Sequence, residues 1–111
     1  MTLRRGVSAL LMGAAVLGGS AGSATGADRR TVELRDVAFS PEKLRVRSGT
    51  TVVFRWRDAA TPHNVRSRGR LRFPSTGERT RGTHAVRLTR RGTYPYVCTI
   101  HPGMSGSVVV R

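Results

Sequence analysis

Four residues of the 111-residue chain have the types and spacing of a metal site. Cys98, His101 and Met104 follow one another in a C-x2-H-x2-M pattern, and His63 lies 35 residues before the cysteine. A thiolate, two imidazoles and a weak thioether are the ligands of the trigonal His2Cys copper site with a long axial Met that transfers electrons. Zinc is the competing metal, but methionine is a poor zinc ligand and structural zinc sites use Cys and His in pairs. The residue types therefore favour copper.

Other reactive groups are sparse in the sequence. We find no nucleophile–base pair and no paired acid/base carboxylates, so we expect no enzymatic activity. The single cysteine excludes a disulfide scaffold, and it excludes a dinuclear copper centre that needs two bridging thiolates. His84 lacks neighbouring residues of ligand type, so we expect an ordinary strand or loop histidine there.

The elements that position these residues are predicted to be strands. Apolar residues alternate with polar ones in six segments, and no segment has a helical apolar stripe. The inward pairs and triplets are Val32 and Leu34; Leu44 and Val46; Val52, Phe54 and Trp56; Val86 and Leu88; Tyr94, Tyr96 and Cys98; Val108 and Val110. His63 is expected to begin another strand, and Arg66–Thr83 is expected to be a long connection with at most one short edge strand. About seven to eight strands with one apolar face each predict an all-β sandwich of two sheets.

Residues 1–27 have the three-part pattern of a secretory signal peptide. Arg4 and Arg5 precede an uncharged apolar run, Val7–Leu17, and small residues lead on to Ala27. The 11 residues of this run would rise only about 16 Å as a helix, against roughly 30 Å for a bilayer core. We therefore expect a cleaved leader, with a single mature domain at residues 28–111.

The mature domain is strongly basic. Residues 28–111 hold 18 basic and 6 acidic residues, a net charge of +12. Such a charge favours anionic partners, and a weak association with an anionic envelope polymer or membrane surface is one expectation. Nucleic acid is not an expected partner, because the chain is predicted to be exported and its aromatic residues are predicted to face inward.

The sequence resembles the cupredoxins, the small blue copper proteins that include plastocyanin, pseudoazurin and amicyanin. The segment Tyr96-x-Cys98-x2-His101-x2-Met104-x-Gly106 is the most specific marker. Phe39-Ser-Pro, Gly49–Phe54 and His63-Asn64-Val65 support it. The two-residue gap between His101 and Met104 is similar to the amicyanin arrangement, whereas the acidic docking patch of many plastocyanins is absent. The resemblance covers essentially the whole mature chain and implies a Greek-key sandwich.

The resemblance also implies a role for each site residue. His63, Cys98 and His101 would be the equatorial ligands of one type 1 copper ion, and Met104 the axial ligand. Asn64 would hydrogen-bond across to the Cys98 loop. His101 would be the electron exit, with its ring edge at a surface lined by Pro62, Pro102, Ala59 and Ala60.

We therefore expect an extracytoplasmic, monomeric carrier of single electrons between redox proteins, with partners that present acidic docking surfaces. The alternative is a copper chaperone or reservoir that uses the same ligands. Delivery proteins favour exposed Met- or His-rich tracts, and the sequence has none beyond the site itself.

Overall fold

The computed structural model describes residues 28–111, so the predicted leader at 1–27 lies outside the described residues. Within that range the chain forms strands and no helix, and it therefore has no helix long and apolar enough to cross a membrane. The strands are β2 (Arg29–Arg35), β3 (Ala38–Ser40), β4 (Lys43–Val46), β5 (Thr50–Trp56), β6 (Arg66–Ser67), β7 (Thr83–Leu88), β8 (Gly92–Val97) and β9 (Ser105–Val110).

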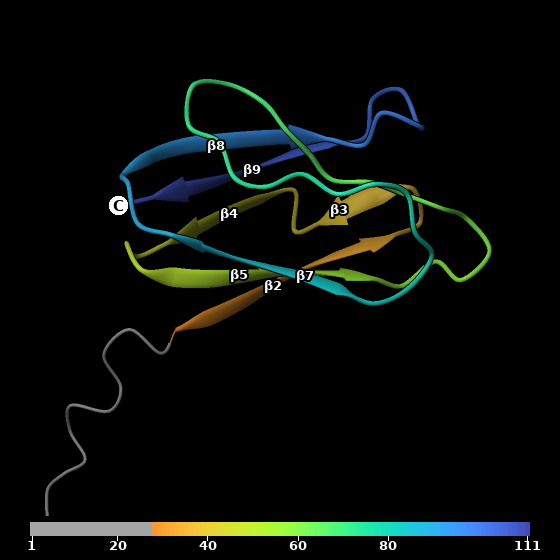
Figure 1. Ribbon diagram of the computed structural model, residues 1–111, viewed down its shortest axis with the longest axis horizontal. Helices are drawn as coiled ribbons and strands as arrows, with labels where there is room; N and C mark the ends of the chain where they lie inside the picture. The colour runs from red at the N-terminus through yellow and green to blue at the C-terminus, as the bar shows by residue number, and fades with distance from the viewer. Residues whose placement is uncertain (1–27) are drawn as a thin grey trace, which may run out of the picture.

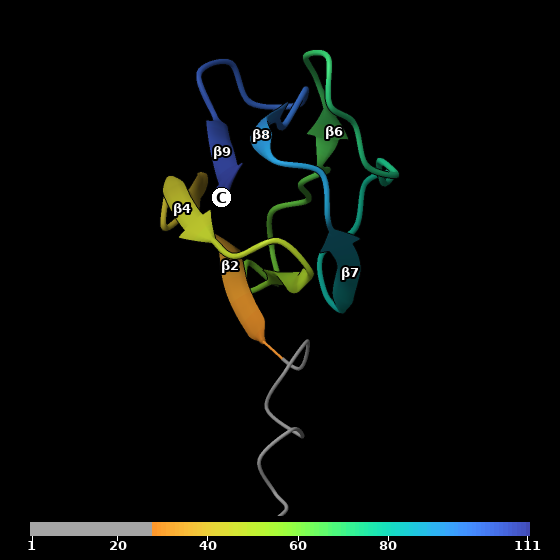
Figure 2. The ribbon, with the colours of Figure 1, turned by 90° about the vertical axis from the view of Figure 1, so that its left-hand side faces the viewer.

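Two four-stranded sheets form the sandwich. One sheet has the order β3-β2-β5-β7 and the other has the order β4-β9-β8-β6. Strands β2 and β5 pair in parallel, as do β4 and β9, while the remaining pairs are antiparallel. Figure 1 shows the strands running along the long axis of the molecule, and Figure 2 shows β8 and β9 in one layer with β2 and β7 in the other. The predicted all-β Greek-key sandwich is confirmed.

The core lies between the sheets and is built from the predicted inward residues. Leu34 and Phe54 from one sheet and Tyr96 and Val108 from the other are fully buried. The Phe54 and Tyr96 rings meet edge to face with centroids 5.1 Å apart, a geometry that aromatic pairs prefer. Period-2 alternation puts successive side chains on opposite faces, so one face of each strand supplies this core.

The connection between β5 and β7 differs from its prediction at one point. The short edge strand expected there is present as β6, which pairs with β8. The strand expected to begin at His63 is wrong, because His63 forms only an isolated bridge with Arg79. Two residues later the Val65 N–H donates to the Thr76 hydroxyl over 3.1 Å, so a side chain replaces a neighbouring strand as its partner.

The strands give the molecule two distinct ends. Strands β5 and β8 finish, and β9 begins, at the end that holds the predicted ligands; we call it the ligand end. Strands β2 and β5 begin, and β4 and β9 finish, at the opposite end. Strand lengths of six or seven residues separate the two ends by about 20 Å.

Candidate metal centre

Three of the predicted ligands belong to one short loop between β8 and β9. The two strands pair up to Val97 and Ser105, which leaves residues 98–104 as the connection. Two backbone hydrogen bonds close it: Cys98 N–H donates to the Met104 carbonyl over 2.9 Å, and Met104 N–H to the His101 carbonyl over 3.1 Å. Cys98 and Met104 are buried, and His101 is half-buried. The turn thus returns the chain to the end of β8.

His63 reaches the same place from the segment after β5. Its backbone exchanges two hydrogen bonds of 3.1 Å with Arg79. The indole Nε1 of Trp56 donates to the His63 carbonyl over 2.8 Å, and the Arg79 guanidinium lies 4.7 Å from the centre of the Trp56 ring. The side chain of His63 is fully buried. Trp56, the last residue of β5, and Arg79 therefore hold the backbone of His63 in place.

The structure brings His63, Cys98 and His101 into one cluster. One ligand atom of each residue lies within 4.8 Å of the corresponding atoms of the other two. The two imidazole rings have centroids 4.9 Å apart at an interplanar angle of 60°. His84 is not in this cluster. Its Nε2 lies 2.7 Å from the Pro74 carbonyl oxygen instead.

The hydrogen bonds of the two imidazoles leave the same nitrogen of each ring available. His63 Nε2 lies 2.7 Å from Asp58 Oδ2, and His101 Nε2 lies 3.1 Å from the Pro62 carbonyl oxygen. Both oxygens accept, because the hydrogen bond from His63 holds the pKa of the Asp58 carboxyl below its ordinary value, and a carbonyl has no proton to give. Each neutral ring therefore carries its proton on Nε2 and has a lone pair on Nδ1.

His63 Nδ1 has no hydrogen-bond partner among the described residues although it is buried. A buried nitrogen lone pair without a partner is unfavourable unless something binds it. A neighbouring cysteine sulfur and a second imidazole are the donors that copper prefers. A carboxylate on the far nitrogen of a ligating histidine is also a usual feature of metal sites. The residues present therefore fit a copper ion.

Asn64 links the two ligand segments. Its Oδ1 accepts from the Thr99 backbone N–H over 2.9 Å, and its Nδ2 donates to the Thr99 hydroxyl over 2.8 Å. Thr99 directly follows Cys98, so these two hydrogen bonds hold the residue after His63 against the residue after the cysteine. The contact expected of Asn64 is present.

Two further residues support the cluster without having been predicted to do so. Asp58 orients His63, and Trp56 was expected only in the core, where its ring does lie. A carboxylate five residues before a histidine has no characteristic spacing. The indole hydrogen bond to His63 depends on how the chain turns after β5. Neither feature has a sequence signal that could have revealed it.

These features define a class of copper protein. Its members are small β-sandwiches that bring a buried cysteine and two histidines with free Nδ1 atoms together at one end. The chain belongs to the family of copper binding proteins described as the plastocyanin/azurin family, whose model matches residues 27–111. It is a small blue copper protein of the electron-transfer type, with one type 1 copper ion as its cofactor. The suspected cupredoxin family is confirmed.

Individual relatives agree with this assignment. The chain is 34% identical over 85 residues to amicyanin-alpha of Methylorubrum extorquens, a match that covers 72% of this chain and 70% of that protein. It is 32% identical over 84 residues to amicyanin of Paracoccus denitrificans, which covers 72% of this chain and 63% of that protein. A solved structure of a reduced amicyanin mutant superimposes with a TM-score of 0.64 at 33% identity, over 78% of this chain and 83% of that one.

Proposed function

We propose that the protein carries single electrons between redox proteins, with copper held by His63, Cys98 and His101 and with Met104 as the axial ligand. The observation that carries the proposal is the buried, unpartnered Nδ1 of His63 beside a cysteine and a second imidazole. Met104 is buried, and its backbone carbonyl accepts a hydrogen bond from the Cys98 N–H. Met104 therefore belongs to the same short loop as Cys98 and His101, which supports its role as the axial ligand.

The chain's own residues would keep the site rigid during electron exchange. Copper, when bound, supplies the chemistry by alternating between its Cu(II) and Cu(I) forms. The thiolate and thioether suit Cu(I), while the imidazoles serve both oxidation states. Asp58 and Asn64 hold His63 and the Cys98 loop from outside, so the ligands need little rearrangement when one electron arrives or leaves.

The electron would enter and leave through His101. Of the three clustered ligands, His101 is half-buried, whereas His63 and Cys98 are buried. Pro62, whose carbonyl lies 3.1 Å from His101 Nε2, is half-buried, and Pro102, the next residue in the chain, is exposed, which supports an apolar rim around the ring. Ala59 and Ala60, the other residues expected in the rim, are exposed. An apolar rim allows a partner to approach the ring edge without removing charged groups from water.

The first test is a visible and EPR spectrum of residues 28–111 with one equivalent of Cu(II). An intense blue thiolate-to-copper band with narrow copper hyperfine splitting is expected. The variant Cys98→Ser should lose the band, whereas His84→Ala should keep it, because His84 lies outside the cluster. A pale spectrum typical of nitrogen and oxygen ligands in the native protein would exclude the type 1 site.

The second test separates an electron carrier from a copper carrier. His101→Gly that still holds copper should exchange electrons more slowly with a soluble redox partner, with His84→Gly as the matched control. Equal rates in both variants would remove His101 as the route. If the native protein instead exchanged electrons slowly and released Cu(I) rapidly to a chelator, copper delivery would be the better description.

We further propose that the protein works outside the cytoplasm as a monomer, after cleavage of residues 1–27. The apolar run and small residues of the leader support export, and the basic mature chain suits redox partners with acidic docking surfaces. N-terminal sequencing of the exported protein should begin at Asp28, and its sedimentation should match one chain. Retention of the leader in a cytoplasmic fraction would contradict this part.

A further inference from the structure

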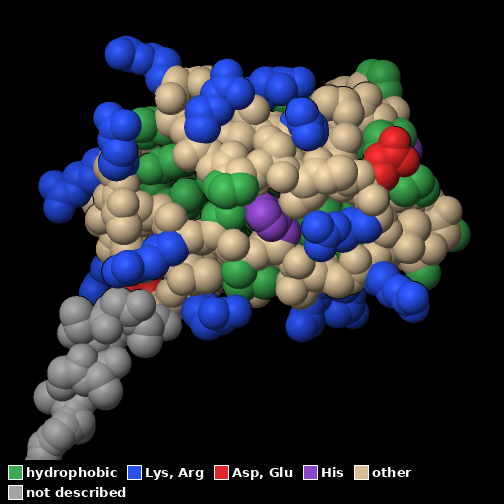
Figure 3. All heavy atoms as spheres, viewed as in Figure 1, with side chains coloured by type: hydrophobic (Ala, Val, Ile, Leu, Met, Phe, Trp, Pro, Cys, Tyr) green, Lys and Arg blue, Asp and Glu red, His purple; other side chains and the backbone are tan. Residues whose placement is uncertain are grey.

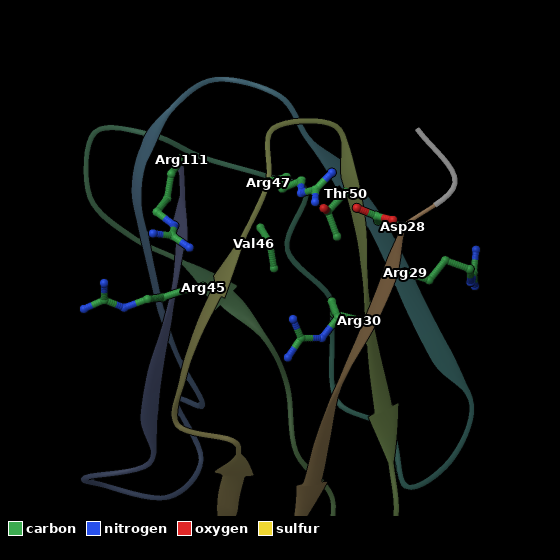
Figure 4. Close-up of a pocket in the computed structure, with 8 residues that line it drawn as sticks. All are labelled: Asp28, Arg29, Arg30, Arg45, Val46, Arg47, Thr50 and Arg111. Atoms are coloured by element: carbon green, nitrogen blue, oxygen red, sulfur yellow. The ribbon is translucent and has the colours of Figure 1, made fainter. Parts of the chain in front are cut away.

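The end of the sandwich opposite the ligand cluster carries an unusual concentration of arginine. A pocket between β2 and β4 is lined there by five arginines, which we call the basic end: Arg29, Arg30, Arg45, Arg47 and Arg111. In Figure 4 the guanidinium of Arg30 points into the gap, while Arg29 and Arg45 point outward on either side. Figure 3 shows basic side chains around this end of the molecule, and others spread over the rest of the visible face.

The positive charge of the basic end is not neutralised by the described residues. All five arginine residues are exposed, and no ion pair within residues 28–111 involves any of them. Asp28 is the one acidic residue that lines the pocket. The paired carboxylates of Glu33, Asp36 and Asp58 belong to the part of the molecule nearer the ligand end. The protein is therefore electrically polarised along its strands.

The basic end offers charge without an apolar anchor. Within residues 28–111 the exposed large hydrophobic residue is Val37, in the turn after β2 at the ligand end. Protein–protein interfaces draw most of their affinity from buried aromatic and apolar anchors. A surface whose charged groups are five guanidinium groups and one carboxylate suits a partner that presents many phosphates and needs no complementary pocket. The headgroup layer of an anionic bilayer is such a partner.

The path of the chain points to the same partner. The described part of the chain begins at Asp28, which itself lines the basic end, and the sequence before it contains the uncharged apolar run Val7–Leu17. During the predicted export, a leader inserted in the membrane would tether the domain through Asp28, and therefore through the basic end. Such a tether would bring the arginines of the basic end within reach of phosphate headgroups.

We propose that the basic end docks the folded domain on the surface of an anionic lipid bilayer, with the ligand end directed away from the membrane. The contact is electrostatic and reversible, and it weakens as salt screens the charges. The strands separate the docked surface from the His63–Cys98–His101 cluster by about 20 Å. If the proposed electron-carrier function is correct, a docked molecule can still exchange electrons, since His101 remains uncovered.

The test is co-sedimentation of copper-loaded residues 28–111 with vesicles. This segment contains both sheets and every residue of the core cluster. Vesicles of phosphatidylcholine mixed with phosphatidylglycerol should retain the protein at low salt, and vesicles of phosphatidylcholine alone should not. Replacing Arg45, Arg47 and Arg111 by Gln should weaken retention by about tenfold or more. The matched control replaces three exposed arginines of the ligand half by Gln: Arg55, Arg66 and Arg81.

Each outcome decides the proposal. Strong loss in the first triple variant with little loss in the second supports a docking surface at the basic end. Equal losses in the two variants would show a dependence on net charge alone and would overturn the proposal. Equal binding to neutral vesicles would also overturn it, as would binding to an acidic polypeptide but not to vesicles.

The orientation has its own test. A nitroxide on the lipid headgroup should broaden the amide signals of residues 45–47 in the Cu(I) protein and spare residues 99–104. The opposite pattern would overturn the orientation. The blue spectrum, measured separately, tests the proposed function.

Discussion

Asp58 Oδ2 accepts a hydrogen bond from His63 Nε2 over 2.7 Å, and the same carboxylate also accepts from the turn that joins β2 to β3. The backbone N–H groups of Asp36 and Val37 donate to it over 3.0 and 3.4 Å. Both turn residues have positive φ, 54° and 56°, which is unfavourable for a β-branched residue such as Val37. One carboxylate thus stabilises a strained turn and fixes the tautomer of a ligand histidine.

Replacing Asp58 by Asn should change the copper site without removing a ligand. The neutral amide accepts more weakly from His63, so the ring becomes less basic and Cu(II) loses more stabilisation than Cu(I). We expect about 10- to 100-fold weaker Cu(II) binding and a higher reduction potential, measured by competition with a chelator and by voltammetry. Glu33→Gln is the control, because it removes a charge that pairs with Arg35. Equal potentials in Asp58→Asn and the native protein would contradict this role.

The two hydrogen bonds between Asn64 and Thr99 should contribute unequally to stability. Asn64→Ala removes both of them and leaves the Thr99 N–H without its partner, so the free energy of unfolding should fall by about 1–2 kcal/mol. Thr99→Val removes only the bond to the hydroxyl and should have the smaller effect. Urea unfolding of the copper-free variants measures both. A larger effect of Thr99→Val would show that the backbone bond is not the important one.

Gly106 is expected to tolerate no side chain. A Cβ at this position would lie 2.8 Å from Tyr96 Cε1, 2.9 Å from its hydroxyl and 3.0 Å from the Glu42 carbonyl oxygen. Because a buried ring and a backbone atom cannot move aside cheaply, Gly106→Ala should destabilise the fold by about 1–3 kcal/mol. Gly77→Ala is the matched control, since its Cβ would meet nothing within 4 Å. Thermal unfolding that is the same for both variants would refute the steric argument.

Tyr96→Phe should stabilise the protein. The Tyr96 hydroxyl is buried and has no hydrogen-bond partner among the described residues. Removing an unsatisfied buried group while keeping the ring in the core should gain about 1 kcal/mol at neutral pH. A lower melting temperature for the variant would indicate a partner for the hydroxyl, such as a bound water.

The same substitution should change the response to alkaline pH. Burial, with the charge of Glu42 adding to it, raises the pKa of Tyr96 above its ordinary value. The folded protein therefore keeps a proton that the unfolded chain releases, and its stability falls as the pH rises above about 10. The gap in unfolding free energy between Tyr96→Phe and the native protein should widen above that pH. The measurement is urea unfolding at several alkaline pH values. If burial did not raise the pKa of the Tyr96 phenol, the difference in unfolding free energy between the two proteins would be the same at every pH.

The sequence was most informative where the structure depends on local spacing. The loop from Cys98 to Met104 joins two neighbouring strands, so its ligand pattern could be recognised directly. Alternation likewise predicted the buried faces, such as Val52, Phe54 and Trp56 on β5. Strand β3 was not predicted, because three residues with a single buried side chain are too few for a period to be visible.

Contacts that depend on irregular segments, or that join residues far apart in the sequence, were much harder to predict. His63 was assigned to the site only through the ligand types of Cys98, His101 and Met104, and the bridge to Arg79 that holds it in place of a strand was missed. Asp58 acts through a side chain in an irregular segment, where neither period nor spacing constrains its direction. Such contacts follow from the packing of the two sheets, which a pattern along one chain does not contain.

Asp28 and Arg111, the two ends of the described chain, both lie at the end of the sandwich opposite the ligands. The parallel pairing of β2 with β5 and of β4 with β9 produces this arrangement. A linker or fusion partner attached at Asp28 or at Arg111 would therefore leave the ligand end open. A molecule tethered to an electrode through either terminus would present the same face to solution, so both attachments should give matching contact with a dissolved redox partner.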